Sequence, residues 1–121
     1  MSYDLMVFDH DAAPRDRPGF MGWYDQQTEW SEDHSYDDPA VCGEPLRAWF
    51  LDIIVQFPAM NGPHASGQDD DATVTDYSVG TKVIYAAFAW SQAEAARAAV
   101  LRLAERHRVG FFDASADVGG L

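Results

Sequence analysis

The segment TKVIYAAFAW, residues 81–90, constrains the fold more than any other stretch of the chain. Alternate side chains of a strand point to opposite faces, and here both faces are apolar. One face would carry Val83, Tyr85, Ala87 and Ala89, and the other Ile84, Ala86, Phe88 and Trp90. An antiparallel strand with one face in water should alternate apolar with polar residues. We therefore expect a cover over the second sheet face: the loop 58–72, a second copy of the chain in a homodimer, or a partner.

The order of the expected elements indicates a single α+β domain over residues 1–121. Apolar periodicity and Pro/Gly punctuation predict helices over 17–30, 45–57 and 92–107, and strands over 2–9, 73–80, 81–90 and 109–115. The SQAE run, in which Ser91 and Glu94 would cap each other's backbone, predicts the start of the last helix. The order strand, helix, helix, strand, strand, helix, strand predicts a ferredoxin-like split βαβ sandwich, with the helices on one face of a four-stranded antiparallel sheet.

The negative charge is concentrated in the middle of the sequence. The formal net charge is −12, and residues 18–81 hold twelve acidic residues against a single base, Arg47. Such a surface repels phosphates, so we expect no binding to nucleic acid or to anionic membranes. It would speed the encounter with a basic protein, although acidic surfaces also serve solubility alone.

The cell compartment follows from what the sequence lacks. No apolar run approaches the length that spans a bilayer, and the first residues lack the features of a signal peptide. Cys42 is the one cysteine and cannot form an internal disulfide. The expectation is a cytoplasmic protein.

The segment TEWSEDHSYDDP, residues 28–39, holds five carboxylates, one histidine and two aromatic residues without a lysine or arginine. A protein interface can use aromatic residues as anchors and carboxylates to select a basic partner. The predicted partner-binding residues are Trp30, Glu32, Asp33, Tyr36, Asp37 and Asp38, joined by Asp69 and Asp70 of the second acidic run. The same pattern fits a loop whose own aromatic residues pin it to the domain, and both interpretations stay open.

No recognisable catalytic, metal-binding or phosphate-binding motif accompanies these residues. His34 lies near Asp33 and two further aspartates, but without the spacing of a known metal site, so no metal and no cofactor are expected. Cys42 lies among more acids than bases, which favours an incidental role, and Asp113 is expected to be a partly buried structural acid. The sequence leans against an enzyme. The alternative is a small dimeric enzyme or ligand-binding protein with a pocket between sheet and helices, lined by Tyr85, Trp90 and Phe111.

A resemblance adds to this interpretation. The runs WYDQQTEWSEDHSYDDP, FPAMNGP, DYSVG, IYAAFAWS and GFFDAS resemble a small family of bacterial cytosolic proteins of this length, over nearly the whole chain. Some similar proteins lie beside genes for secreted antibacterial toxins. The resemblance therefore implies an immunity protein, an inhibitor that occludes a toxin, and it carries over no functional residue. Together with the charge, it predicts a non-catalytic binding protein.

Overall fold

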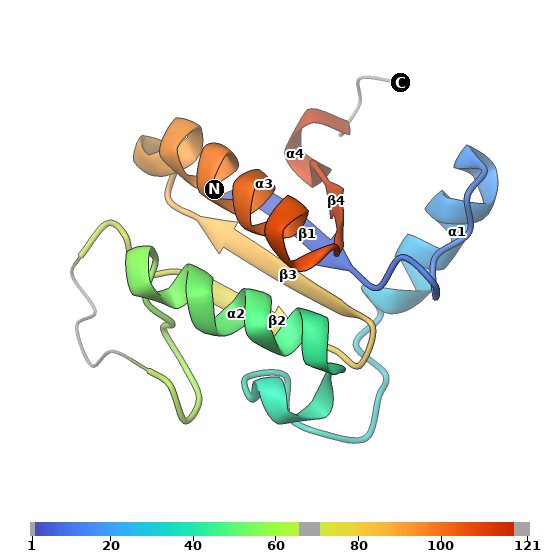
Figure 1. Ribbon diagram of the computed structural model, residues 1–121, viewed down its shortest axis with the longest axis horizontal. Coiled ribbons are helices and arrows are strands. Elements are labelled where there is room, and N and C mark those ends of the chain that lie inside the picture. The colour runs from blue at the N-terminus through green and yellow to red at the C-terminus, as the bar shows by residue number, and fades with distance from the viewer. Residues whose placement is uncertain (1, 66–70, 118–121) are drawn as a thin grey trace.

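The four strands form one antiparallel sheet in the order β2-β3-β1-β4. The structure is a computed structural model, which describes residues 2–65 and 71–117. The strands are β1 (Tyr3–Phe8), β2 (Asp76–Val79), β3 (Val83–Phe88) and β4 (Gly110–Phe112). Each neighbouring pair is antiparallel, and β1 and β3 occupy the centre (Figure 1). The α+β class and the four-stranded antiparallel sheet are thus confirmed.

The main core lies between the sheet and the helices α2 (Glu44–Gln56) and α3 (Ala93–His107). Pro45 falls in the first turn of α2, where its missing N–H leaves no bond unmade. Trp49 of α2 is fully buried, and its indole N–H donates to the Val100 carbonyl of α3 at 3.4 Å. The fully buried aromatic side chains are Trp49, Phe50, Phe57 and Phe88. Their burial contributes to the apolar core that holds the two helices on this face.

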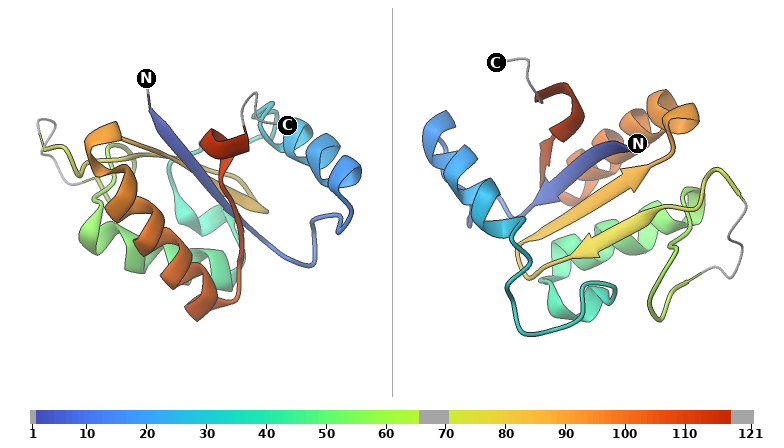
Figure 2. Two further views of the ribbon diagram at one scale, coloured as in Figure 1. Left: turned by 90° about the horizontal axis from the view of Figure 1, so that it is seen from above. Right: turned by 180° about the vertical axis from the view of Figure 1, so that it is seen from behind.

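Helix α1 (Arg17–Gln27) packs on the opposite face of the sheet, as Figure 2 shows from behind. Its Phe20 ring lies 5.1 Å from both Phe8 of β1 and Phe112 of β4, centroid to centroid. This placement differs from the expectation that the helices share one face. The physical reason is that α2 and α3 already fill the first face, while Phe8 and Phe112 need an apolar partner on the second.

The chain itself thus covers part of the second face, and the loop after α2 reaches only the β2 edge of that face. Residues 58–60 run along residue 75 at the β2 edge: Ala59 and Thr75 form a bridge, and the Met60 N–H donates to the Thr75 carbonyl at 2.9 Å. Asn61 and Gly62 then line the hollow beside Asp76 and Ser78, so the described part of the loop 58–72 borders the second face at the β2 edge and does not extend over its centre. Residues 66–70, with the predicted partner-binding residues Asp69 and Asp70, lie outside the described residues.

The start of α3 also differs from the sequence expectation. A 3-10 turn over Trp90–Gln92 precedes the helix, so the N-cap residue is Gln92 and no side chain makes a capping hydrogen bond there. Ser91 lies inside that turn and cannot act as the N-cap, which is why the expected capping box is absent. The short helix α4 (Ala114–Asp117) follows β4 where the strand was expected to continue.

Gly110 is required by a close contact across the sheet. It pairs with Phe8, whose ring lies over it, and a Cβ at this position would come within 2.2 Å of that ring. The Phe8 ring is held in turn by Phe20 and by Trp23 at 5.9 Å. The glycine thus lets the central aromatic side chain of the second face lie flat against the edge strand.

We expect Gly110→Ala to destabilise the fold by about 1–3 kcal/mol, because the added methyl must displace a packed ring. Gly22→Ala in α1 is the matched control, since no atom lies within 4 Å of its Cβ position. Alanine in that helix should leave stability unchanged or raise it by up to about 1 kcal/mol. Urea denaturation of both variants measures the difference, and equal stability of Gly110→Ala and wild type would contradict the packing argument.

Candidate functional site

An acidic groove crosses the part of the second sheet face that α1 leaves open. It consists of two adjoining hollows of about 320 and 380 Å³ that share Asp76 and Ser78. Its carboxylates are Asp4, Asp37 and Asp76, and its aromatic residues are Tyr24, Trp30, Tyr36 and Tyr85. No lysine or arginine is found among the described residues that line it. The groove therefore presents a negative potential that no cation within it offsets.

The sheet register sets two of these carboxylates on either side of an alanine. Asp4 of β1 pairs with Ala87 of β3, and Ala87 pairs on its other side with Asp76 of β2. Paired side chains point to the same face, so the three form a row across the sheet. Adjacent strands lie about 4.8 Å apart, which separates the backbones of Asp4 and Asp76 by roughly 10 Å. Two acids thus flank a small side chain, leaving room for a guest between them.

Tyr85 lies in the next row along β3 and orients one of the two acids. Its hydroxyl donates to Asp4 Oδ2 at 2.6 Å, and the Ser2 hydroxyl donates to Asp4 Oδ1 at 2.5 Å. Burial, with the neighbouring Asp4 carboxylate, raises the pKa of Tyr85. The phenol is therefore a neutral donor at physiological pH, and it fixes the Asp4 carboxylate without neutralising it.

Trp30 forms an aromatic wall beside this row. Its ring lies 6.1 Å from that of Tyr85 and 5.2 Å from that of Tyr36, both in edge-on contact. The backbone of Trp30 has a left-handed φ of 51°, a conformation that costs a non-glycine residue roughly 1–2 kcal/mol. The ring contacts offset that cost, so the chain after α1 is held in the turn that aims the indole at the sheet.

The structure divides the predicted partner-binding residues of the segment 28–39 into two groups. Trp30, Tyr36 and Asp37 line the groove, and Asp33 is exposed beside it. Glu32 accepts hydrogen bonds from the Thr81 N–H and hydroxyl, both at 3.0 Å. Asp38 caps the 3-10 turn at Pro39–Val41 through the Ala40 N–H at 2.9 Å. Both interpretations of this segment thus have support: its aromatic residues pin the loop, and part of its charge faces the groove.

His34 ties the same segment together through both ring nitrogens. Nδ1 lies 2.7 Å from the Ser35 carbonyl oxygen, and Nε2 lies 2.5 Å from Glu32 Oε1. Both partners are acceptors, so the doubly protonated imidazolium satisfies both bonds and a neutral ring satisfies one. The bonds to Ser35 and Glu32 accordingly raise the pKa of His34. Burial alone would raise the pKa of Glu32, but the bonds from His34 and Thr81 outweigh it and lower the pKa.

Sequence reasoning missed Asp4 and Asp76, the two acids at the centre of the groove. The alternation of each strand places both opposite the core side, which was a usable signal. What alternation does not provide is the register, and the register brings the two acids into one row.

The pocket expected from Tyr85, Trp90 and Phe111 is not assembled. Tyr85 faces the acidic groove, Phe111 lines a separate cavity beside α1, and Trp90 is half exposed against Tyr3, with ring centroids 5.1 Å apart. Tyr85 and Phe111 lie on opposite faces of the sheet and Trp90 lies in the 3-10 turn after β3, so the three do not share a pocket.

The remaining sequence candidates occupy structural positions. Cys42 is buried, its thiol donates to the Pro39 carbonyl at 3.0 Å, and burial raises the pKa of the thiol. Asp113 is partly buried and accepts from the Tyr3 hydroxyl at 3.2 Å. Within residues 2–65 and 71–117, no three His, Cys, Asp or Glu side chains lie close enough together to hold a metal ion. Nor does any helix in those ranges have the length and apolar character to cross a membrane.

The His34 contacts predict a pH-dependent contribution to stability. A raised pKa in the folded state stabilises the fold fully below the ordinary histidine pKa of about 6.5, and the effect is lost as pH rises through the folded pKa. His34→Gln should therefore lower the melting temperature at pH values just below 6. It should leave the melting temperature nearly unchanged at alkaline pH, above the folded-state pKa of His34.

Thermal unfolding of wild type and His34→Gln across this range tests the effect, and an NMR titration of the His34 ring measures its pKa directly. Glu32→Gln should bring that pKa back toward the ordinary value. A His34 pKa at or below the ordinary value in the wild type would contradict the arrangement.

Comparison of the chain with family models, with curated proteins and with solved structures finds no match. The evidence for the function of the acidic groove is therefore its own geometry.

Proposed function

We propose that this chain is a non-catalytic binding protein that takes a basic protein partner into the acidic groove. The row Asp4–Ala87–Asp76 is the observation that carries the proposal. A guanidinium or ammonium group placed over Ala87 would lie between two carboxylates and could hydrogen-bond to both. Charge-assisted bonds of this kind are roughly twice as strong as neutral ones.

The aromatic wall supports an arginine or lysine side chain as the inserted group. The indole of Trp30 and the phenol of Tyr85 border the space above Ala87, and an aromatic face attracts a cation within about 6 Å. The apolar stem of the guest would contact these rings while its charged head meets the carboxylates. Tryptophan, tyrosine and arginine are the residues most often found at the energetic centre of a protein interface.

The distribution of charge over the protein favours the same class of partner. The chain carries a net charge of −12, which would accelerate its encounter with a basic protein and repel nucleic acid. A homodimer through this sheet face would bring two copies of the same carboxylates together, so a basic protein fits the groove better. Inhibition of a bacterial toxin, as an immunity-type protein would perform, is the specific form that the sequence resemblance implies.

Neutralising the central row should abolish most of the affinity for that partner. In Asp4→Asn/Asp76→Asn the shapes and the Tyr85 hydrogen bond can be kept, while two charges are lost. Losing two charge-assisted contacts should weaken binding by about 100-fold, taking each as worth about tenfold. The matched control is Glu94→Gln/Glu105→Gln, which removes the same charge from exposed positions of α3 and should change affinity by less than about threefold.

The partner itself is sought by affinity capture from a lysate of the source organism, at low and high salt, with mass spectrometry. A single basic protein, retained by wild type and by the α3 control but lost with the groove variant and at high salt, is the expected result. Capture of no partner, or equal retention by the two double variants, would overturn the proposal.

A charge outside the groove, such as that of Asp33, should affect mainly the rate of association with the partner. Asp33 lies outside the groove, so Asp33→Lys should slow association by about tenfold at low salt and leave the dissociation rate nearly unchanged. Asp37→Lys, inside the groove, should also speed dissociation. Surface plasmon resonance with the captured partner separates the two rates. Identical kinetics for wild type and both variants would exclude this segment from the interface.

A further inference from the structure

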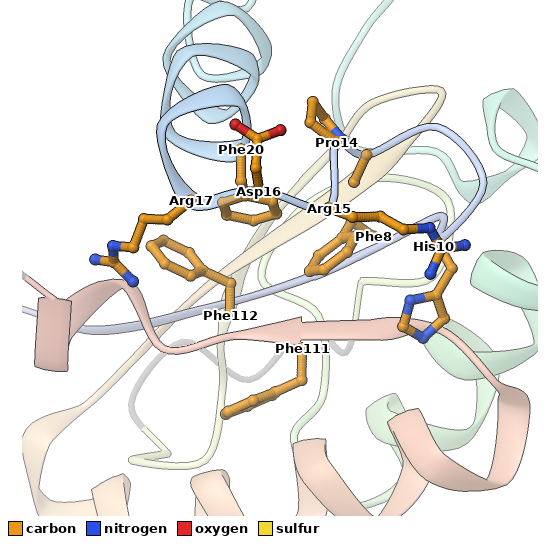
Figure 3. A pocket seen from close by; sticks show the side chains of 10 residues that line it. Phe8, His10, Pro14, Arg15, Asp16, Arg17, Phe20, Phe111 and Phe112 are labelled. Carbon is orange, nitrogen blue, oxygen red and sulfur yellow. The ribbon is translucent and has the colours of Figure 1, made fainter.

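A second cavity, of opposite character, lies at the other end of α1. It has a volume of about 400 Å³, which is within the range of small-molecule sites. It lies between the start of α1, the end of β1 and the edge strand β4 (Figure 3). Tyr24 and Thr28, near the end of α1, line the acidic groove, whereas Arg17 and Phe20, near its start, line this cavity. The two sites are therefore separate along the same helix.

Three phenylalanine rings form the inner wall of the cavity. The rings of Phe8, Phe20 and Phe112 are each partly exposed, and neighbouring centroids lie 5.1 Å apart. Figure 3 shows the three rings gathered between Arg15 and Arg17, while Phe111 points away to the other side of the strand. Rings that keep exposed surface inside a hollow can pack against a flat apolar guest. The wall therefore fits an aromatic body.

One end of this wall carries an arginine and a histidine. The guanidinium of Arg15 lies beside the imidazole of His10 in Figure 3, and both residues line the cavity. Arg15 is exposed and makes no ion pair or hydrogen bond with another residue in the described ranges. Arg17, at the opposite end, has a contact of its own, so the argument rests on Arg15 and His10. An uncommitted guanidinium presents a planar fork that matches a carboxylate or a phosphate.

Two of the acids near this end, Asp16 and Asp9, are already engaged. Asp16 lines the cavity, but its carboxylate accepts the Gly19 N–H at 2.9 Å as the N-cap of α1 and points away from the rings (Figure 3). Asp9 accepts the Asp11 N–H at 2.9 Å and lies 3.8 Å from the Lys82 ammonium. Arginines outnumber acids in the lining by two to one, in a chain whose net charge is −12. This reversal of charge would select against a cationic guest.

We propose that this cavity binds a small anion with an aromatic body, its carboxylate or phosphate head on Arg15 and His10 and its ring on Phe8, Phe20 and Phe112. Each part of the ligand then has a matching part of the wall, because the guanidinium pairs with the head while the phenyl rings pack on the body. The ligand is chemically the opposite of the basic partner proposed for the acidic groove, so the two sites are tested independently.

The probes are benzoate, phenyl phosphate and the neutral isostere benzamide, each titrated into the full chain and followed by NMR chemical shifts of the backbone amides. We expect benzoate, phenyl phosphate or both to shift the amides of residues 8–20 and 110–112, with benzamide at least tenfold weaker. The comparison of benzoate with phenyl phosphate identifies the preferred head group. Shifts that are absent from both segments, or equal affinity for benzamide, would overturn the proposal.

Arg15→Gln tests the proposed anion contact, because one charge-assisted pair is worth about tenfold in affinity. Arg102→Gln removes the same charge from an exposed position of α3, outside the cavity lining, and should leave the affinity within about twofold. Arg15 is exposed in a loop, so both variants should fold, as their amide spectra will show. Equal weakening by both variants would reduce the effect to net charge and contradict the site.

Discussion

The apolar character of β3 on both faces is the constraint on which the rest of the structure depends. Ile84, Ala86 and Phe88 pack under α2 and α3, while Val83 is fully buried on the other side. A central strand of this kind cannot leave either face in water without exposing large apolar surface. The chain therefore needs a second cover, and α1 with Trp30 supplies it.

The second cover is smaller than the sheet, and this difference creates the acidic groove. Helix α1 has 11 residues, and its aromatic side chains contact β1 and β4. Beyond it, over β2 and β3, the cover is reduced to Trp30 and Tyr36, and the sheet there carries Asp76 and Ser78. Polar residues therefore occur on the second face in the part where the helix does not reach. The polar residues of β2 thus lie where α1 is too short to cover the sheet.

Sequence patterns predicted the elements because each pattern is local. Pro45 and the alternation of the strands report on the few residues around them, and the structure keeps both. The helix predicted over 17–30 is shorter than expected, because α1 ends at Gln27 and Trp30 lies beyond it with a left-handed backbone. The face that α1 covers was not predictable in this way. An aromatic stripe fits either side of a sheet, and the choice depends on Phe8 and Phe112 remaining uncovered once α2 and α3 are in place.

Local sequence patterns also predicted only part of the candidate site. The segment 28–39 was recognised by its composition, which identified Trp30 and Tyr36 but also included Glu32 and Asp38, whose carboxylates bond within the fold. Asp4 and Asp76 are 72 positions apart in the numbering, each in a strand with no unusual local composition. Their proximity depends on the pairing of both strands with Ala87, and pairing register is a property of the assembled sheet.

Charge is distributed so that α1 lies between two regions of opposite sign. At its start, Arg15 and Arg17 border a hollow with phenylalanine walls, and beyond its end Asp4 and Asp76 border a groove without a basic residue in its described lining. Like charges at the groove repel one another in the free protein, which is an energetic cost that folding alone does not require. Neutral side chains at Asp4 and Asp76 would keep the same sheet pairing and avoid that cost. A cationic partner of the kind we propose would relieve this repulsion on entering the groove, and so would gain affinity from a cost that the free protein already bears.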